Sequence, residues 1–431
     1  MITILAFLFV LGVLVFVHEL GHFLVARWHG VRVLTFSLGF GPKILKTTRG
    51  GTEYCVSVVP LGGYVKLAGE TVEDARTGAP DEFMSQSKWV RFQVYLAGPV
   101  MNLLLAFVVL TFVLMRGADV PLYESSAPVI GAVAVGSPAE AAGLRVGDRI
   151  VSVDGQTTPT WEDFNLAVLP KARRQVAIVA VRNGQRVDVH VTPNALGRYE
   201  MGDLGVTPVW RPEVLQVNPK SPAERAGFRH GDVIVALAGE RSLTRDQIIE
   251  RIRNSANTPV VFAVERDGAE TNLTVVPEGS PGGALIGVQI SPFEVRRIDP
   301  SPLEAVRLSA RQNWDNTVLI GRTLRGLITR ETPVRQLMGP VAIAELSGSA
   351  AQLGFAALFN LMAMISLNLG LLNLMPVPVL DGGHIAIPAV EGIARRDLSV
   401  KVKERILLAG AALIALLMVT VIYNDIARLL R

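Results

Sequence analysis

The sequence predicts a polytopic α-helical membrane protein with about four transmembrane helices, a membrane-associated β-hairpin and two tandem α+β domains. Three observations predict this fold class. Long apolar runs gather near both ends of the 431-residue chain, the middle has an ordinary soluble composition, and that middle section repeats itself. The mean hydropathy of +0.38 therefore averages membrane spans with a soluble insert. The net charge of +4 is small for this length and argues against nucleic-acid binding.

Four apolar runs are each close to the ~20 residues that a helix needs to cross a bilayer. They are residues 2–26, 94–115, 354–375 and 406–423. The first run lacks the basic start of a signal peptide and is too long for one, so we expect it to be retained. The alternative is that all four are core helices of a large soluble protein, but such runs rarely occur together in soluble chains.

Basic residues beside the apolar runs predict the orientation. They follow the first run, precede the second and separate the third from the fourth: Arg27, Arg32, Lys43, Lys46, Arg49, Lys88, Arg91, Arg395, Arg396, Lys401, Lys403 and Arg405. The positive-inside rule makes these stretches cytoplasmic. Both termini and the middle section then face outside, which in a Gram-negative bacterium is the periplasmic side of the inner membrane.

Residues 36–67 favour a β-hairpin, because glycines and β-forming residues dominate there and apolar residues alternate. Beside a membrane-embedded site, such a β-loop can hold an extended substrate by edge pairing. The alternative is a plain cytoplasmic hairpin.

The middle section holds two copies of one pattern. SPAEAAGLRVGDRIVSVDG at residues 137–155 recurs as SPAERAGFRHGDVIVALAG at residues 221–239. Each copy predicts a short helix, a glycine turn and a strand, with Asp148 or Asp232 placed to accept hydrogen bonds from turn amides. The repeat unit is as large as a domain, so two tandem domains are expected. The pattern resembles the bacterial PDZ fold, which implies either peptide binding at a sheet edge or a role as spacer or steric filter.

The cluster His18-Glu19-Leu20-Gly21-His22 carries the predicted chemistry. Residues four apart share one face of a helix, so both imidazoles can reach one metal ion with Glu19 beside it. This HExxH arrangement supplies two zinc ligands and a general base. The cluster lies inside an apolar run, where each ionisable residue costs roughly 2.5–3.5 kcal/mol on insertion scales and therefore indicates function. The alternative is a set of satisfied core side chains, which explains this register poorly.

A zinc site needs a third protein ligand and an open position. The sequence NLMPVPVLDGG at residues 373–383 ends the third apolar run, and its two prolines break the helix. Irregular backbone at membrane depth is tolerated only within protein or beside a wet cavity. Asp381 is the only carboxylate in this segment, so it is the favoured third ligand, and His384 is a competing candidate.

HELGH in the first run, the tandem PDZ-like repeat and the NLMPVPVLDGG motif together resemble the site-2 protease family of zinc metalloproteases. The motifs FSLGFGP, PLGGYVKLAGE and AGPVMN extend the resemblance over essentially the whole chain. The resemblance implies that His18, His22 and Asp381 bind Zn²⁺ and that Glu19 is the catalytic base. It also implies that Asn373 holds the substrate or stabilises the oxyanion.

The resemblance further implies an enzyme that hydrolyses peptide bonds within transmembrane segments of single-span proteins. The implied substrates are an anti-sigma factor already trimmed outside the membrane, in envelope stress signalling, and signal-peptide remnants. The PDZ pair would then exclude untrimmed ectodomains. One alternative is a membrane PDZ scaffold with structural zinc, which would not need Glu19. Another is a metal transporter, which two large soluble domains fit poorly.

We expect five parts along the chain, with membrane lipid, transmembrane substrates and PDZ peptide ligands as partners and no nucleic acid. The parts are residues 1–118 with two spans, the first PDZ-like domain at 119–208, the second at 209–292, a connecting amphipathic region at 293–353, and the last two spans at 354–431. Trp314, Arg322 and Arg325 indicate a helix at the membrane surface or against the PDZ pair. Cys55 is the only cysteine, so no intrachain disulfide forms.

Overall fold

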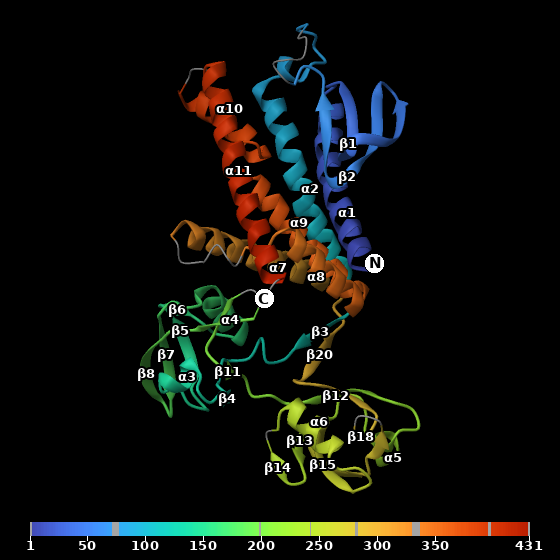
Figure 1. Ribbon diagram of the computed structural model, residues 1–431, viewed down its shortest axis with the longest axis vertical. Coiled ribbons are helices and arrows are strands. Elements are labelled where there is room, and N and C mark those ends of the chain that lie inside the picture. Colours follow the sequence, from blue (N-terminus) through green and yellow to red (C-terminus); the bar gives the residue numbers. More distant parts are fainter. Residues whose placement is uncertain are drawn as a thin grey trace. The chain divides into compact units, whose positions relative to one another are not determined.

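A computed structural model describes residues 2–70, 77–197, 200–241, 243–280, 283–329, 337–394 and 398–429. The predicted cytoplasmic residues Arg395 and Arg396 lie outside this range. The chain divides into two compact units. The first unit combines the residues up to Gly117 with Asp299–Thr329 and the residues from Leu337 onwards, and the second contains Ala118–Ile298. Figure 1 shows the helices of the first unit in blue and orange to red, and the β-rich second unit in green to yellow.

The first unit is mainly helical. Its helices are α1 (Ile2–Trp28), α2 (Lys88–Met115), α7 (Pro302–Ile328), α8 (Pro340–Leu353), α9 (Phe355–Asn373), α10 (Asp381–Ala394) and α11 (Val400–Leu429). Among the described residues, α1, α2, α9 and α11 are long and apolar enough to cross a membrane. These four match the four predicted runs, so the predicted membrane architecture is confirmed. α11 extends beyond the predicted residues 406–423 at both ends.

Glycines allow α2 to pack closely between α1 and α9. A methyl group on Gly21 of α1 would overlap the backbone oxygen of Ala97 in α2. On the α9 side, a methyl group on Gly370 would lie 3.0 Å from the backbone oxygen of Pro99. Close helix contact through small residues is the usual way in which membrane helices gain packing energy. The approach brings the HELGH segment of α1 against α2.

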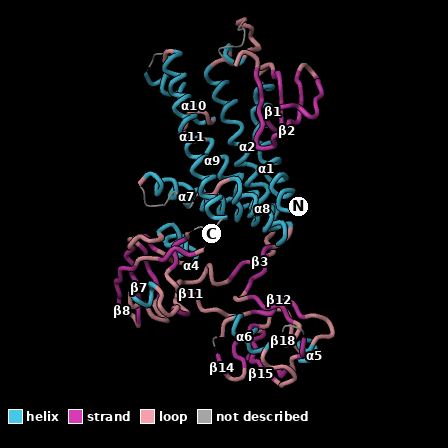
Figure 2. The backbone as a smooth tube through the Cα atoms, viewed as in Figure 1, coloured by secondary structure: helices cyan, strands magenta, loops and turns pink. Residues whose placement is uncertain are grey.

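A long β-hairpin follows α1, as predicted. It consists of β1 (Val33–Arg49) and β2 (Thr52–Leu67), paired antiparallel. The two strands fold back on themselves, because Phe36 pairs with Tyr54 on one side and with Val65 on the other. The outer part of the hairpin exposes large apolar side chains, namely Phe40, Ile44, Leu45, Val56, Val58 and Val59. Figure 2 shows this hairpin in magenta among the cyan helices of the first unit.

The second unit contains two successive domains of similar layout, and each combines short helices with a small antiparallel sheet. The first contains β4 (Ala132–Val133), α3 (Pro138–Ala141), β5 (Arg149–Val153), β6 (Gln156–Thr157), α4 (Trp161–Val168), β7 (Val176–Arg182), β8 (Gln185–Val191), β9 (Asn194–Leu196), β10 (Met201–Asp203) and β11 (Val206–Thr207). Its main sheet has the strand order β6-β5-β7-β8, and β4 pairs with β11.

The second domain repeats this layout. It contains β12 (Glu213–Val217), α5 (Pro222–Ala226), β13 (Val233–Leu237), β14 (Glu240–Arg241), α6 (Arg245–Arg253), β15 (Val260–Arg266), β16 (Ala269–Val275), β17 (Glu278–Ser280), β18 (Gly283–Leu285) and β19 (Val288–Ser291). Its sheet has the order β16-β15-β13-β12-β19. Outside the two domains, β3 (Ala118–Pro121) pairs with β20 (Val295–Ile298), so the segments that lead into and out of this unit run together. The predicted pair of PDZ-like domains is confirmed.

Each domain contains the same buried ion pair. Asp148 meets the Nε atom of Arg182 at 2.7 Å, and Asp232 meets that of Arg266 at the same distance. Both aspartates are fully buried. Asp148 also accepts a hydrogen bond from the backbone N–H of Arg145 at 2.8 Å, which confirms the predicted bond to a turn amide. The repeated pattern therefore specifies one ion pair with a buried aspartate in each domain.

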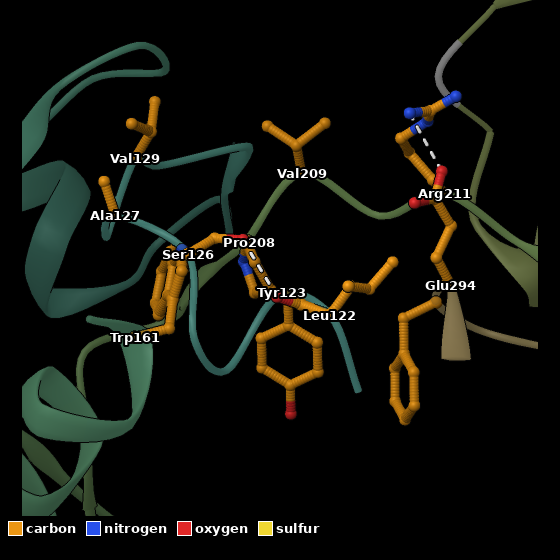
Figure 3. Close-up of a pocket in the computed structure, with 11 residues that line it drawn as sticks. Leu122, Tyr123, Ser126, Ala127, Val129, Trp161, Pro208, Val209, Arg211 and Glu294 are labelled. Atoms are coloured by element: carbon orange, nitrogen blue, oxygen red, sulfur yellow. Dashed lines mark hydrogen bonds and ion pairs between the residues drawn. The ribbon is translucent and has the colours of Figure 1, made fainter. Parts of the chain in front are cut away.

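Three aromatic rings join the connecting segments of the second unit. The ring of Tyr123 lies 5.5 Å from that of Trp210, between the domains, and 5.1 Å from that of Phe293, after them. Beside these rings is a cavity of about 270 Å³ whose rim includes an ion pair of 2.9 Å between Arg211 and Glu294 (Figure 3). The junction thus fastens together segments that are far apart in the sequence.

Candidate metal centre

Two imidazoles and one carboxylate converge in the first unit. His18 and His22 lie on one face of α1, and Asp381 is the first residue of α10. His18 Nε2 is 3.1 Å from Asp381 Oδ2, His22 Nε2 is 3.5 Å from Asp381 Oδ1, and the two Nε2 atoms are 3.3 Å apart. Ligands of a tetrahedral Zn²⁺, at 2.0–2.2 Å from the ion, lie roughly 3.3–3.6 Å from one another. The distances from the two histidines end on different oxygens of Asp381, and one ligand atom from each of the three residues lies within 4.8 Å of the others. The three side chains are therefore close enough to bind one ion.

A broken helix brings Asp381 to the histidines. α9 ends at Asn373, and helical structure resumes only at Asp381. Between them Val379 adopts a φ of +87°, a conformation that β-branched residues rarely take. The glycines at 382 and 383 leave no room for side chains, because a methyl group on either would overlap a backbone oxygen of the preceding segment. The proline-broken span predicted here is thus observed, and it places a carboxylate at the start of a helix.

Helix α2 supplies a hydrogen-bond partner for the Nδ1 atom of each histidine. His22 Nδ1 donates a hydrogen bond to the backbone oxygen of Val94 at 2.7 Å. His18 Nδ1 lies 3.1 Å from the side-chain amide of Asn102. Metal-binding imidazoles usually have such a partner for their second nitrogen, because it fixes the orientation of the ring. A methyl group on Gly98 would overlap His22 Nε2, so only glycine leaves the donors their space.

Glu19 lies next to the donors and contacts the hairpin. Its carboxylate accepts a hydrogen bond from the backbone N–H of Val65 in β2. A methyl group on Gly63 would lie 3.0 Å from Glu19 Cγ and 2.7 Å from the backbone oxygen of Ser37, so glycine permits this close approach. Glu19 is not one of the three converging donors, which suits a base that acts beside a metal.

The other two candidates lie outside the group of donors. Asn373, the last residue of α9, is half-buried, and nothing in the described part of the chain joins its side chain to the donors. His384 stacks on Tyr95 of α2, with ring centroids 4.9 Å apart and an angle of 13°. Within the described residues, the group that could hold a metal ion contains Asp381 and not His384.

Asn102 and Gly98 lie against the two histidines, and the sequence analysis named them only as part of the motif AGPVMN, without a role at the site. A signal for Asn102 was present, because it is the only side-chain amide in the apolar run 94–115. A buried polar side chain at membrane depth indicates function by default. The backbone oxygen of Val94 carries no sequence signal, because any residue supplies one.

Comparisons with known proteins find relatives over almost the whole chain. The sequence profile described as Peptidase family M50 matches residues 6–417. The chain is 34% identical to the Regulator of sigma-E protease RseP of Escherichia coli K12, over 98% of each protein. It is 33% identical to Protease RseP of Yersinia pestis, over 99% of each. The solved PDZ domain of an SdrC-like protein from Listeria innocua matches 19% of this chain and 92% of its own length, with 20% identity and a TM-score of 0.17.

These relatives share almost the full length of the chain, so the resemblance predicted from the motifs is confirmed. The candidate spans and the relatives make it a multi-pass membrane protein. Zn²⁺ is the metal of this family, and the converging donors have the chemistry that Zn²⁺ prefers. The chain belongs to peptidase family M50 and is a zinc metalloprotease.

Proposed function

We propose that this zinc metalloprotease cuts peptide bonds inside the membrane, within the transmembrane segments of single-span proteins. In this proposal His18, His22 and Asp381 hold Zn²⁺, and Glu19 is the catalytic base. One observation carries it: the donors belong to a helix of membrane-spanning length. α1 has 27 residues, about 40 Å, and His18 lies about 24 Å from its start and about 15 Å from its end. A hydrocarbon core of about 30 Å therefore contains the site.

The residues divide the chemical work between them. Zn²⁺ held by the three donors would polarise the scissile carbonyl and lower the pKa of a bound water towards about 7. Glu19 takes the proton of the attacking water and delivers it to the leaving nitrogen. The N–H of Val65 holds the Glu19 carboxylate in place. Asn373 donates to the substrate or to the developing oxyanion, as in our expectation from the resemblance.

The hairpin presents the substrate as an extended strand. A helical substrate buries its carbonyls in backbone hydrogen bonds, so it must unwind before it is cut. Val65, whose N–H reaches Glu19, belongs to the last part of β2, which pairs with the start of β1. A substrate strand added beside β2 would lie next to the base. The exposed apolar side chains of the hairpin suit lipid or a bound transmembrane segment.

The PDZ-like domains select substrates in this proposal. The first domain has a cavity of about 350 Å³ between α4 and the segments 196–197 and 201–206, lined by Phe164, Val168, Leu169, Leu196 and Met201 among others. An apolar groove beside a helix suits an extended peptide end. A substrate trimmed outside the membrane offers such an end, and an untrimmed ectodomain is kept away by its size.

The basic residues and the bacterial relatives support a proposal for the location. We place the protein in a bacterial inner membrane, with the PDZ-like domains in the periplasm and the metal site towards the cytoplasmic side. The substrates in this setting are an anti-sigma factor trimmed in an envelope stress response and signal-peptide remnants.

Reconstitution tests the proposal. The purified chain and a labelled single-span protein are placed in liposomes, and cleavage is compared between the parent and Glu19→Gln. We expect cleavage that a zinc chelator stops, and none in Glu19→Gln, which still binds zinc. Persistent cleavage in Glu19→Gln would reject the assigned base. Peptide binding without cleavage would favour the scaffold, and zinc flux would favour a transporter.

Deleting residues 127–290 tests the role of the PDZ-like domains separately. The shortened enzyme should cut untrimmed substrate that the parent leaves intact. If its preference for trimmed substrate is unchanged, the domains do not select.

A further inference from the structure

We propose that Asn102 is a positioning residue of the metal centre, whose side-chain oxygen accepts the N–H of His18 Nδ1 and so directs the Nε2 lone pair at the metal. This inference rests on the proposed zinc site. It adds a residue of α2 to a site whose motifs lie on α1 and at the start of α10.

The side chain of Asn102 is fully buried and only half satisfied. Its amide nitrogen is placed 3.1 Å from His18 Nδ1. Its oxygen Oδ1 is buried without a hydrogen-bond partner in the described part of the chain. Either orientation of the carboxamide leaves one end without a described partner, so burial alone does not decide which end faces His18.

Metal binding determines which way the amide faces. The oxygen and nitrogen of a carboxamide exchange places when the group rotates by half a turn, and the hydrogen-bond network decides between the two arrangements. With the NH₂ group against His18, Nδ1 must accept, and the ring proton then occupies Nε2. That proton would block the nitrogen that faces His22 and Asp381. With the oxygen against His18, Nδ1 keeps the proton and Nε2 is free to bind the metal.

The position of Asn102 is itself fixed by α9. The hydroxyl of Ser366 donates to the backbone oxygen of Asn102 at 2.8 Å, and Ser366 is fully buried. α9 is the helix that leads to Asp381. The residue that orients one ligand is therefore bonded to the helix that delivers another.

The two histidines differ in a way that makes the inference testable. The partner of His22 is a backbone oxygen, which a change of side chain leaves in place. The partner of His18 is a side chain, which a substitution removes. Replacing Asn102 should consequently weaken metal binding by His18 and leave the hydrogen bond of His22 in place.

The test measures zinc affinity by chelator competition on the full-length protein in detergent. Asn102→Leu removes the acceptor at similar size, and we expect zinc to bind roughly 10–100-fold more weakly. Asn102→Asp keeps an oxygen that accepts the same N–H, so its affinity should stay within about threefold of the parent. Thr111→Val is the matched control, because the described partner of its hydroxyl lies within α2 and is the backbone oxygen of Phe107, at 2.8 Å. It should bind zinc as the parent does.

Parent-like affinity in Asn102→Leu would overturn the proposal. So would equal weakening in Asn102→Asp and Asn102→Leu, because packing rather than the acceptor would then explain the loss. If Asn102→Leu does not fold, Asn102→Ala replaces it, with the same expected weakening. The variant His18→Ala tests the zinc site separately from the role of Asn102. Parent-like zinc affinity in His18→Ala would overturn the zinc site. If zinc affinity falls in His18→Ala but not in Asn102→Leu, only the role of Asn102 is overturned.

Discussion

The chain surrounds two carboxylates in different ways. In the first PDZ-like domain, Asp148 meets the guanidinium of Arg182, so the chain supplies its own cation. In the membrane unit, the described partners of Asp381 are His18 and His22. A buried charge is stable only when it is paired or binds a metal. Arg182 carries a permanent charge, whereas the imidazoles beside Asp381 are charged only when protonated, so the second arrangement has the chemistry of a Zn²⁺ site. A permanent cation beside the carboxylate thus distinguishes the structural ion pair from the metal site.

Asp381→Asn should produce the largest effect. The substitution removes the negative charge that offsets Zn²⁺, so zinc binds more weakly. Because a Lewis acid stabilises the transition state by several kcal/mol, the rate of cleavage should fall roughly a thousandfold or more. Zinc per chain, measured by atomic emission, should fall with it, while the melting of the PDZ-like domains is unchanged. Full zinc content in Asp381→Asn would contradict the assignment of this ligand.

Asp148→Asn should destabilise the first PDZ-like domain and leave the zinc site unchanged. Breaking a buried ion pair leaves an uncompensated charge and costs about 3–5 kcal/mol. We expect the low end, about 3 kcal/mol, because the Arg182 side chain is 26% exposed and water replaces part of the lost interaction. Hydrogen exchange in β5 and β7 should speed up, while zinc content and zinc affinity stay those of the parent. Exchange at the parent's rate would mean that the pair does not stabilise the domain.

Acid should weaken the structural pair in a defined range. The hydrogen bonds from Arg182 hold the pKa of Asp148 below its usual value. Stability from a lowered carboxyl pKa is fully present above the unfolded value of about 3.9 and is lost as the pH falls through the folded pKa. The protection of amides in the first domain, relative to the exchange rate of an unfolded chain at the same pH, should therefore fall below about pH 4. In Asp148→Asn this loss of protection should be smaller, and an equal loss in both proteins would remove Asp148 as its cause.

Lys171→Ala should have the smallest effect. Lys171 pairs with Asp154 at 2.6 Å in the same domain, but neither side chain is fully buried. Partly exposed pairs contribute less than about 1 kcal/mol, so the melting temperature should hardly change. A loss as large as that of Asp148→Asn would show that burial does not distinguish the two pairs.

Local spacing predicted much of the site. His18 and His22 are one helical turn apart, so a sequence pattern suffices to place them on one face. Asp381 was predicted because prolines break an apolar run beside a single carboxylate. The repeat predicted both PDZ-like domains, because its glycine turns and buried aspartates occur twice. These features depend on residues that are close in the sequence.

Contacts between helices were harder to predict. Asn102 and Gly98 act through the packing of α2 on α1, and apolar composition does not show which helices meet. Residues 293–353 were left open between two placements. The structure forms α7 there and packs it on α2, where the hydroxyl of Ser309 donates to the backbone oxygen of Phe107 at 2.9 Å. That contact joins residues far apart in the chain, and the periodicity of apolar residues does not predict such a pairing.

The position of the cleaved bond tests the central claim most directly. A labelled single-span substrate is cleaved by the reconstituted enzyme, and the masses of both products locate the scissile bond. Our account predicts a bond inside the ~20-residue apolar span of the substrate, because the donors lie within a helix of membrane-spanning length. Cleavage confined to the soluble segments that flank the span would contradict it.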